Sequence, residues 1–167
     1  MRIRIDAERS LMDTARAHLD RPGERVGFFL ADVTATGTFV LRQWRHVADD
    51  EIVPSLHAIL SDDAATDIVR WAFDAGKSLV EVHTHGRLVP AAFSPVDVDG
   101  FDDWVHGVRW RLRGAPYAAV VVAEDTIDAW AWTGTSKRPE QVDAIVIDGT
   151  EIIRTTRATM ERLHARP

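Results

Sequence analysis

Two histidines one residue apart stand in the middle of the chain, in the stretch EVHTHGRLVPAAFSPVD at residues 81–97. In a β-strand, side chains two positions apart point to the same face about 7 Å apart, so His83 and His85 can converge on one metal ion. Catalytic zinc takes three protein ligands and leaves one position for water, which requires one more histidine or carboxylate. Asp97 is the nearest plausible third ligand.

The same residues also have a purely structural interpretation. Ser94-Pro95-Val96-Asp97 resembles a capping box, in which a serine and an acidic residue satisfy the unpaired amides at the start of a helix. Both interpretations can hold together, because a capped helix would present Asp97 from its first turn toward the strand end that carries the histidines. Capping alone leaves the two histidines unexplained. A cupin site would need a carboxylate soon after the second histidine, and HGRLVPAAF has none.

The elements around this stretch predict a strand-rich α/β sandwich, since they lack the regular βαβ alternation of a doubly wound sheet. Apolar spacing and caps indicate a helix begun by Asp6, a helix over residues 61–77, one or two helices from Ser94, and a short terminal helix. Asp148-Gly149 indicates a hairpin. Strands are expected at residues 2–5, 24–33, 38–47, 57–60, 78–84, 115–123, 126–134, 143–147 and 150–156.

Composition narrows the class of protein. The 167 residues fit one domain, 1–167, and 46% hydrophobic with 28% charged residues is a globular balance. A net charge of −6 argues against nucleic acid as a partner. There is no cysteine, so a metal must use His, Asp or Glu. No apolar run is long enough to span a bilayer and the N-terminus has no signal-like core, so we expect a cytoplasmic protein with no membrane partner.

The arrangement resembles the JAMM motif of the JAB/MPN metalloprotease family, which reads HxH, usually seven residues, and then SxxD. His83, His85, Ser94 and Asp97 supply the motif positions, and Glu24 in RPGERVGFFLA stands where the family has an upstream glutamate. The likeness spans roughly residues 7–135, in the family's order of helices and strands. Two features depart from the family: eight residues separate His85 from Ser94, and Gly86 replaces a common proline.

This resemblance implies a fold and a set of residue roles. The fold would be an MPN/JAB-like curved mixed sheet flanked by helices, with cytidine-deaminase-like architecture. Zinc held by His83, His85 and Asp97 would activate water, Glu24 would be the general base, and the Ser94 hydroxyl would stabilise the oxyanion. Glu81 shares the histidine face and is a rival for the base or a support for the ligands. A serine hydrolase is disfavoured, because Pro95 has no amide for an oxyanion hole.

The resemblance also implies a function. The chain would be a zinc-dependent, deubiquitinase-like isopeptidase or peptidase that cleaves after the C-terminal tail of a ubiquitin-like protein, with conjugation-pathway enzymes as further partners. Two alternatives stay open. One is a peptidase that processes a sulfur-carrier precursor, and the other is a non-catalytic MPN scaffold or binding module, against which the intact set of ligands argues.

Overall fold

The structure is a computed structural model that describes residues 2–53, 59–86 and 89–164. The helices within these ranges are α1 (Arg9–Leu19), α2 (Asp62–Ala75), α3 (Pro95–Arg111) and α4 (Ala158–His164). The strands are β1 (Ile3–Ala7), β2 (Val26–Val33), β3 (Thr38–His46), β4 (Ile52–Val53), β5 (Ile59–Leu60), β6 (Ser78–Thr84), β7 (Tyr117–Ala123), β8 (Thr126–Trp132), β9 (Glu140–Ile147) and β10 (Glu151–Arg154). His57, from the strand expected at 57–60, lies outside the described residues.

Seven of the strands form a closed barrel. Hydrogen-bonded neighbours follow the order β1-β3-β2-β6-β7-β8-β9, and β9 pairs in turn with β1, which closes the ring. The closing pair is parallel and places Ile5 opposite Ile145. Strand β10 pairs with β9 through the Asp148-Gly149 hairpin that the sequence predicts, with both turn residues at positive φ. The short β4–β5 pair is a separate sheet.

The expected α/β sandwich with an MPN/JAB-like, cytidine-deaminase-like architecture is therefore wrong. An open curved sheet would leave β1, and the side of β9 away from β10, without a partner, whereas pairs from Ile3–Val142 to Ala7–Ile147 join the two strands. Closure satisfies the backbone groups that two edge strands would leave unpaired. The alternating pattern of residues 2–5 indicates a strand but carries no information on its partners, of which β9 is more than a hundred residues away.

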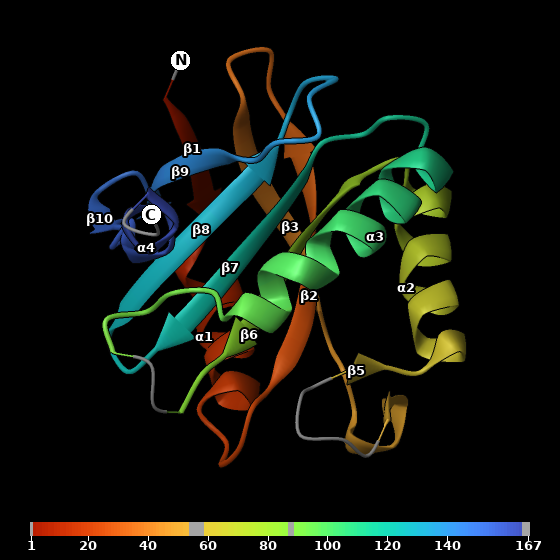
Figure 1. Cartoon of the computed structure of the whole chain (residues 1–167), viewed down its shortest axis with the longest axis horizontal. Coiled ribbons are helices and arrows are strands. Elements are labelled where there is room, and N and C mark those ends of the chain that lie inside the picture. Colours follow the sequence, from red (N-terminus) through yellow and green to blue (C-terminus); the bar gives the residue numbers. More distant parts are fainter. Residues whose placement is uncertain (1, 54–58, 87–88, 165–167) are drawn as a thin grey trace.

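Two apolar layers result from the alternation of side chains along the strands. The interior of the barrel is filled from all seven strands and covered by α1, whose Ala15 and Leu19 are buried in that layer. A second layer lies between the outer faces of β2, β6, β7 and β8 and the helices α2 and α3 (Figure 1). Trp130 and Trp132 are buried in this second layer.

Short-range interactions explain where the helices near the candidate site begin and end. Helix α2 begins where the Ser61 side chain accepts a hydrogen bond from the Ala64 amide, and it ends at Gly76, whose φ of 62° favours glycine. Helix α3 starts at Pro95 and runs without interruption past Gly100 and Gly107. Asp6 does not cap α1: it lies in β1, and the N-cap residue is Glu8. Among the described helices, every one is too short or too polar to cross a membrane.

Candidate metal centre

The end of β6 and the first turn of α3 meet at the three residues that the sequence singles out. His83 and His85 are 7% and 8% exposed, and Asp97 is half-buried. The Asp97 Oδ2 atom lies 3.6 Å from His83 Nε2 and 3.3 Å from His85 Nε2. One ligand atom from each residue falls within 4.8 Å of the others, so the three could hold one metal ion.

Asp97 is held in this position by the start of its own helix. The Ser94 amide donates to Asp97 Oδ2 at 2.7 Å, and the Asp97 amide donates to Ser94 Oγ at 3.2 Å. This is the capping box that the sequence predicts, and it coexists with the ligand geometry. The cap therefore directs one carboxylate oxygen toward both imidazoles, and it leaves the Ser94 hydroxyl proton available to another acceptor.

Glu81 supports His83 from the opposite side of its ring. The His83 Nδ1 atom lies 3.4 Å from Glu81 Oε1. The other Glu81 oxygen accepts from the Tyr117 hydroxyl at 2.5 Å and from the Trp104 indole nitrogen at 3.2 Å. A carboxylate on Nδ1 keeps the proton on that nitrogen and leaves Nε2 as the atom able to bind a metal, as in carboxylate–histidine–zinc arrangements.

Charges around the site shift three pKa values. Burial alone would lower the pKa of His83, but the carboxylates of Asp97 and Glu81 outweigh it and raise that pKa to about 9. Burial alone would raise the pKa of Asp97, yet contacts from the two histidines outweigh it and hold the pKa well below its usual range. Burial and the Glu81 charge both raise the pKa of Tyr117, which therefore stays a hydroxyl that donates to Glu81.

The donor set fits a transition metal such as zinc. Two imidazoles and a carboxylate are typical ligands of a catalytic zinc ion, which leaves a fourth position open. Two buried atoms, His83 Nε2 and His85 Nδ1, have no hydrogen-bond partner in the part of the chain that the structure describes. Buried polar atoms are rarely left without a partner, so an unpaired imidazole nitrogen beside a carboxylate points to a ligand.

Glu24 lies near the site but does not join the cluster. The Thr84 amide donates to the Arg25 carbonyl at 2.9 Å, and the Arg25 amide donates to Thr84 Oγ1 at 2.8 Å. This pairing brings residue 24 to the end of β6 where His85 lies. The Glu24 side chain is exposed, and within residues 2–53, 59–86 and 89–164 no hydrogen bond or ion pair engages it.

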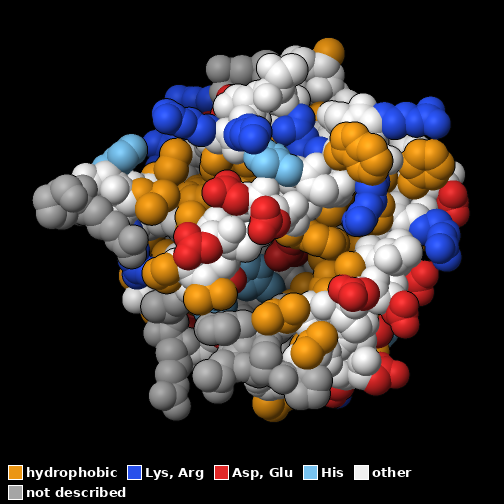
Figure 2. All heavy atoms as spheres, turned by 45° about the vertical axis from the view of Figure 1, so that its right-hand side comes forward, with side chains coloured by type: hydrophobic (Ala, Val, Ile, Leu, Met, Phe, Trp, Pro, Cys, Tyr) orange, Lys and Arg blue, Asp and Glu red, His pale blue; other side chains and the backbone are white. Residues whose placement is uncertain are grey.

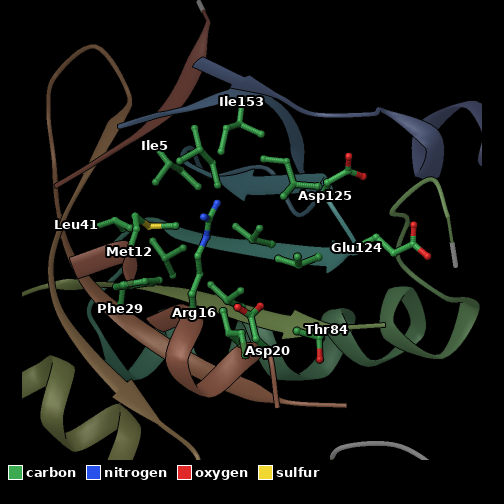
Figure 3. Close-up of a pocket in the computed structure, with 17 residues that line it drawn as sticks. Ile5, Met12, Arg16, Asp20, Phe29, Leu41, Thr84, Glu124, Asp125 and Ile153 are labelled. Atoms are coloured by element: carbon green, nitrogen blue, oxygen red, sulfur yellow. The ribbon is translucent and has the colours of Figure 1, made fainter. Parts of the chain in front are cut away.

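The two faces of β6 border different spaces. One face borders a hollow on the molecular surface, and the other borders a cavity inside the barrel. Figure 2 shows a histidine at the bottom of a hollow whose rim carries hydrophobic and acidic side chains. Thr84, which alternates with the histidines, faces a different space, an apolar cavity of about 310 Å³ inside the barrel under α1. Arg16 extends into this cavity, and Asp20 and Glu124 lie at its edge (Figure 3). The cavity therefore lies behind the candidate metal centre and shares none of its ligands.

Three contributors to the site could not be read from the sequence. Tyr117 comes from β7 and Trp104 from the middle of α3, and only the packing of α3 on the strands brings them to Glu81. The Phe93 ring packs 5.7 Å from the His83 ring. The sole sequence signal was that Glu81 shares the face of His83.

Comparison with known proteins gives information on the fold alone. No family model and no curated protein sequence matches the chain. The solution structure of protein DSY2949 from Desulfitobacterium hafniense is similar, with a TM-score of 0.50, 15% identity, and coverage of 86% of this chain and 92% of that one. The solution structure of a protein from Salinibacter ruber gives a TM-score of 0.49, 19% identity, and coverage of 88% and 94%. The likeness to the first of these concerns the barrel-like fold and assigns no activity.

Proposed function

We propose that this protein is a zinc-dependent hydrolase of peptide or isopeptide bonds, with His83, His85 and Asp97 as the metal ligands. The observation that carries the proposal is the convergence of two buried imidazoles and one capped carboxylate, with an unpaired nitrogen on His83. The sequence likeness to the JAMM motif supports the same reaction class. That support comes from the motif residues and their spacing, and it does not depend on a shared fold.

The side chains have distinct roles in this reaction. Zinc, when bound, supplies a Lewis acid that polarises a carbonyl and makes an attacking water acidic near neutral pH. The Glu24 carboxylate takes a proton from the attacking water and delivers it to the leaving amine. The Ser94 hydroxyl, whose oxygen accepts from the Asp97 amide, donates its proton to the developing oxyanion. Glu81 holds the His83 ring rather than moving a proton.

The substrate class follows from the motif likeness. We propose the bond after the extended C-terminal tail of a ubiquitin-like protein, because such a tail can pair with a strand edge by backbone hydrogen bonds and small residues fit a narrow approach to the metal. Conjugation-pathway enzymes are the further partners of this proposal. We place its action in the cytoplasm as part of the same proposal.

Metal content tests the core of the proposal. We expect purified protein to bind about one zinc ion, as a single three-ligand site requires. Asp97→Ala should lose that zinc, measured by chelator competition and elemental analysis. Asp99→Ala is the matched control, because Asp99 is an exposed aspartate on the same helix. A fully metallated Asp97→Ala protein would remove Asp97 from the ligand set and overturn the proposal.

A second experiment separates the two enzymatic alternatives. A linear fusion carried on the tail of a ubiquitin-like protein and a lysine-linked conjugate of the same protein are offered at equal concentration. Faster cleavage of the conjugate supports deconjugation, and cleavage of the linear fusion alone supports precursor processing. A zinc-loaded protein that cleaves neither would favour the binding-module alternative.

A further inference from the structure

The segment Ala91–Phe93, which leads into the capping box, is held by threonine side chains. All three of its residues are 2% exposed or less. The Ala91 amide donates to Thr126 Oγ1 at 2.9 Å, and the Ala91 carbonyl accepts from Thr156 Oγ1 at 2.6 Å. The Phe93 amide, the last before Ser94, donates to Thr159 Oγ1 at 2.9 Å. These anchors come from the start of β8 and from the region around the start of α4.

Thr159 is in turn fixed by a fully buried carboxylate. Its hydroxyl donates to Asp128 Oδ2 at 2.6 Å and its amide donates to the same oxygen at 3.0 Å. Asp128 Oδ1 accepts from the Ala129 amide and from the Gln141 side chain, both at 2.9 Å. Asp128 is 0% exposed, and all four of these groups are donors, which matches a carboxylate that only accepts.

The direction of these hydrogen bonds decides what Thr159 can do. A hydroxyl has one proton and two lone pairs, and the proton is committed to Asp128, so a lone pair is presented to the Phe93 amide. A continuous path then runs from Asp128 through Thr159 and Phe93 to Ser94, whose own amide binds Asp97. The Phe93 ring adds a second contact, because it packs 5.7 Å from the His83 ring.

We infer that Asp128 and Thr159 are positioning residues for the metal ligand Asp97, so that the segment leading into α4 fixes the geometry of the metal centre. The inference rests on the proposed zinc site. A buried carboxylate is costly unless every oxygen is satisfied, and an apolar pair would fill the same space without that cost. The pair instead orients the one threonine oxygen that reaches the backbone just before the capping box. Groups that bond a metal ligand directly typically change metal affinity about 10-fold to 100-fold, and Thr159 acts one hydrogen bond further out.

Substitution of Thr159 tests the inference with zinc and cobalt as probes. Thr159→Val removes the hydroxyl at nearly constant shape. It should weaken zinc binding by up to about 10-fold and alter the d–d absorption of the cobalt-loaded protein. Thr159→Ser keeps the hydroxyl and should restore both. Thr14→Val is the matched control, since the Thr14 hydroxyl bonds only the Ser10 carbonyl of α1 among the described residues. A folded Thr159→Val protein with wild-type affinity and spectrum would overturn the inference.

Amide exchange of the wild-type protein gives an independent test that needs no variant. If Thr159 stabilises the metal centre, zinc must stabilise the Thr159 contacts by the same coupling free energy. Zinc should therefore slow hydrogen exchange at the Phe93 and Thr159 amides, and unchanged exchange at both would contradict the inference. Wild-type protein that binds no zinc overturns the metal centre itself, whereas zinc binding without these effects overturns only the role of Asp128 and Thr159.

Discussion

The Nδ1 atom of His83 lies 3.4 Å from the Glu81 carboxylate, on the side of the ring away from Asp97. The sequence leaves two roles open for Glu81, that of the general base in place of Glu24 and that of a support for the histidine ligands, and this contact favours the second role. Glu81 is occupied by His83, Tyr117 and Trp104, so its carboxylate is engaged in holding a ligand. Glu24 is exposed, and no hydrogen bond or ion pair from the described residues engages it, so its role as the base stays a prediction.

Glu81→Gln should weaken zinc binding about 10-fold to 100-fold, the usual effect of losing the partner of a ligating histidine. The amide keeps the size of the side chain but loses the charge that favours a proton on His83 Nδ1. Chelator competition measures the zinc affinity, and Glu8→Gln, an exposed glutamate before α1, is the control. Zinc affinity equal to that of the wild type would show that the Glu81 contact does not orient His83.

Glu24→Ala should retain zinc and lose hydrolysis by about 100-fold to 10,000-fold, the usual contribution of a general base. The reason is that Glu24 is not one of the three grouped residues and, among the described residues, makes no hydrogen bond or ion pair with them, so its removal should leave the metal centre intact. Zinc content and the cleavage rate of the fusion are measured on the same sample. Normal cleavage by Glu24→Ala together with loss of cleavage by Glu81→Ala would transfer the role of base to Glu81.

Zinc binding should release about one proton near pH 7.5, because zinc binds the deprotonated imidazole of His83 whereas the raised pKa, about 9, keeps that ring protonated in the metal-free protein. Zinc affinity should therefore rise as the pH increases toward 9. Calorimetric titration in two buffers of different ionisation enthalpy counts the proton. An equal heat of binding in both buffers would contradict the protonated state.

The same pKa contributes to the pH dependence of the metal-free fold. A folded-state pKa near 9 against an unfolded value of 6.5 means that the folded protein binds the proton more tightly. This contribution to the free energy of unfolding is complete below pH 6.5 and is lost as the pH rises through 9. Urea unfolding of metal-free wild-type and His83→Gln protein at pH 6 and pH 9 isolates this contribution. The loss of stability at pH 9 should be smaller in the variant, and an equal loss in both proteins would contradict the prediction.

The ligand cluster could be predicted because its determinants are local. His83 and His85 are related by strand alternation, and Asp97 by three residues of a capped helix, so secondary structure alone sets their directions. The one long-range step, the meeting of β6 with the first turn of α3, spans only the short segment between them. The structure brings these three residues together, and their role as metal ligands stays a prediction.

The barrel and the supports of the site could not be predicted, because they depend on long-range pairing. Closure requires Ile5 to meet Ile145, and nothing in an alternating apolar strand names its partner. The hydrogen-bond partners of Glu81 could not be predicted for the same reason. Tyr117 and Trp104 belong to apolar patterns in the sequence, and they donate hydrogen bonds to Glu81 only because α3 packs over β6 and β7. Local pattern thus predicts which groups share a face, and packing decides what they contact.

Gly27→Ala should lower the free energy of unfolding by about 1–3 kcal/mol, the usual cost of overpacking. A Cβ atom at Gly27 would lie 2.1 Å from the Trp44 ring, and that ring cannot move freely because it packs 4.6 Å from the Phe29 ring. Gly134→Ala is the control, since a Cβ there meets nothing within 4 Å among the described residues.

The cause of this effect can be isolated with a double mutant. If the clash with Trp44 is the whole reason, Gly27→Ala should cost much less in a Trp44→Ala background, because the space that the new methyl group enters is then vacant. Urea unfolding of the wild type, the two single variants and the double variant gives the coupling free energy between residues 27 and 44. Gly27 lies between Val26 and Phe28 in the strand that pairs with the histidine strand, with Val26 opposite His83. If the two substitutions instead lower the free energy of unfolding additively, the glycine is required by the backbone conformation and not by the close approach of Trp44.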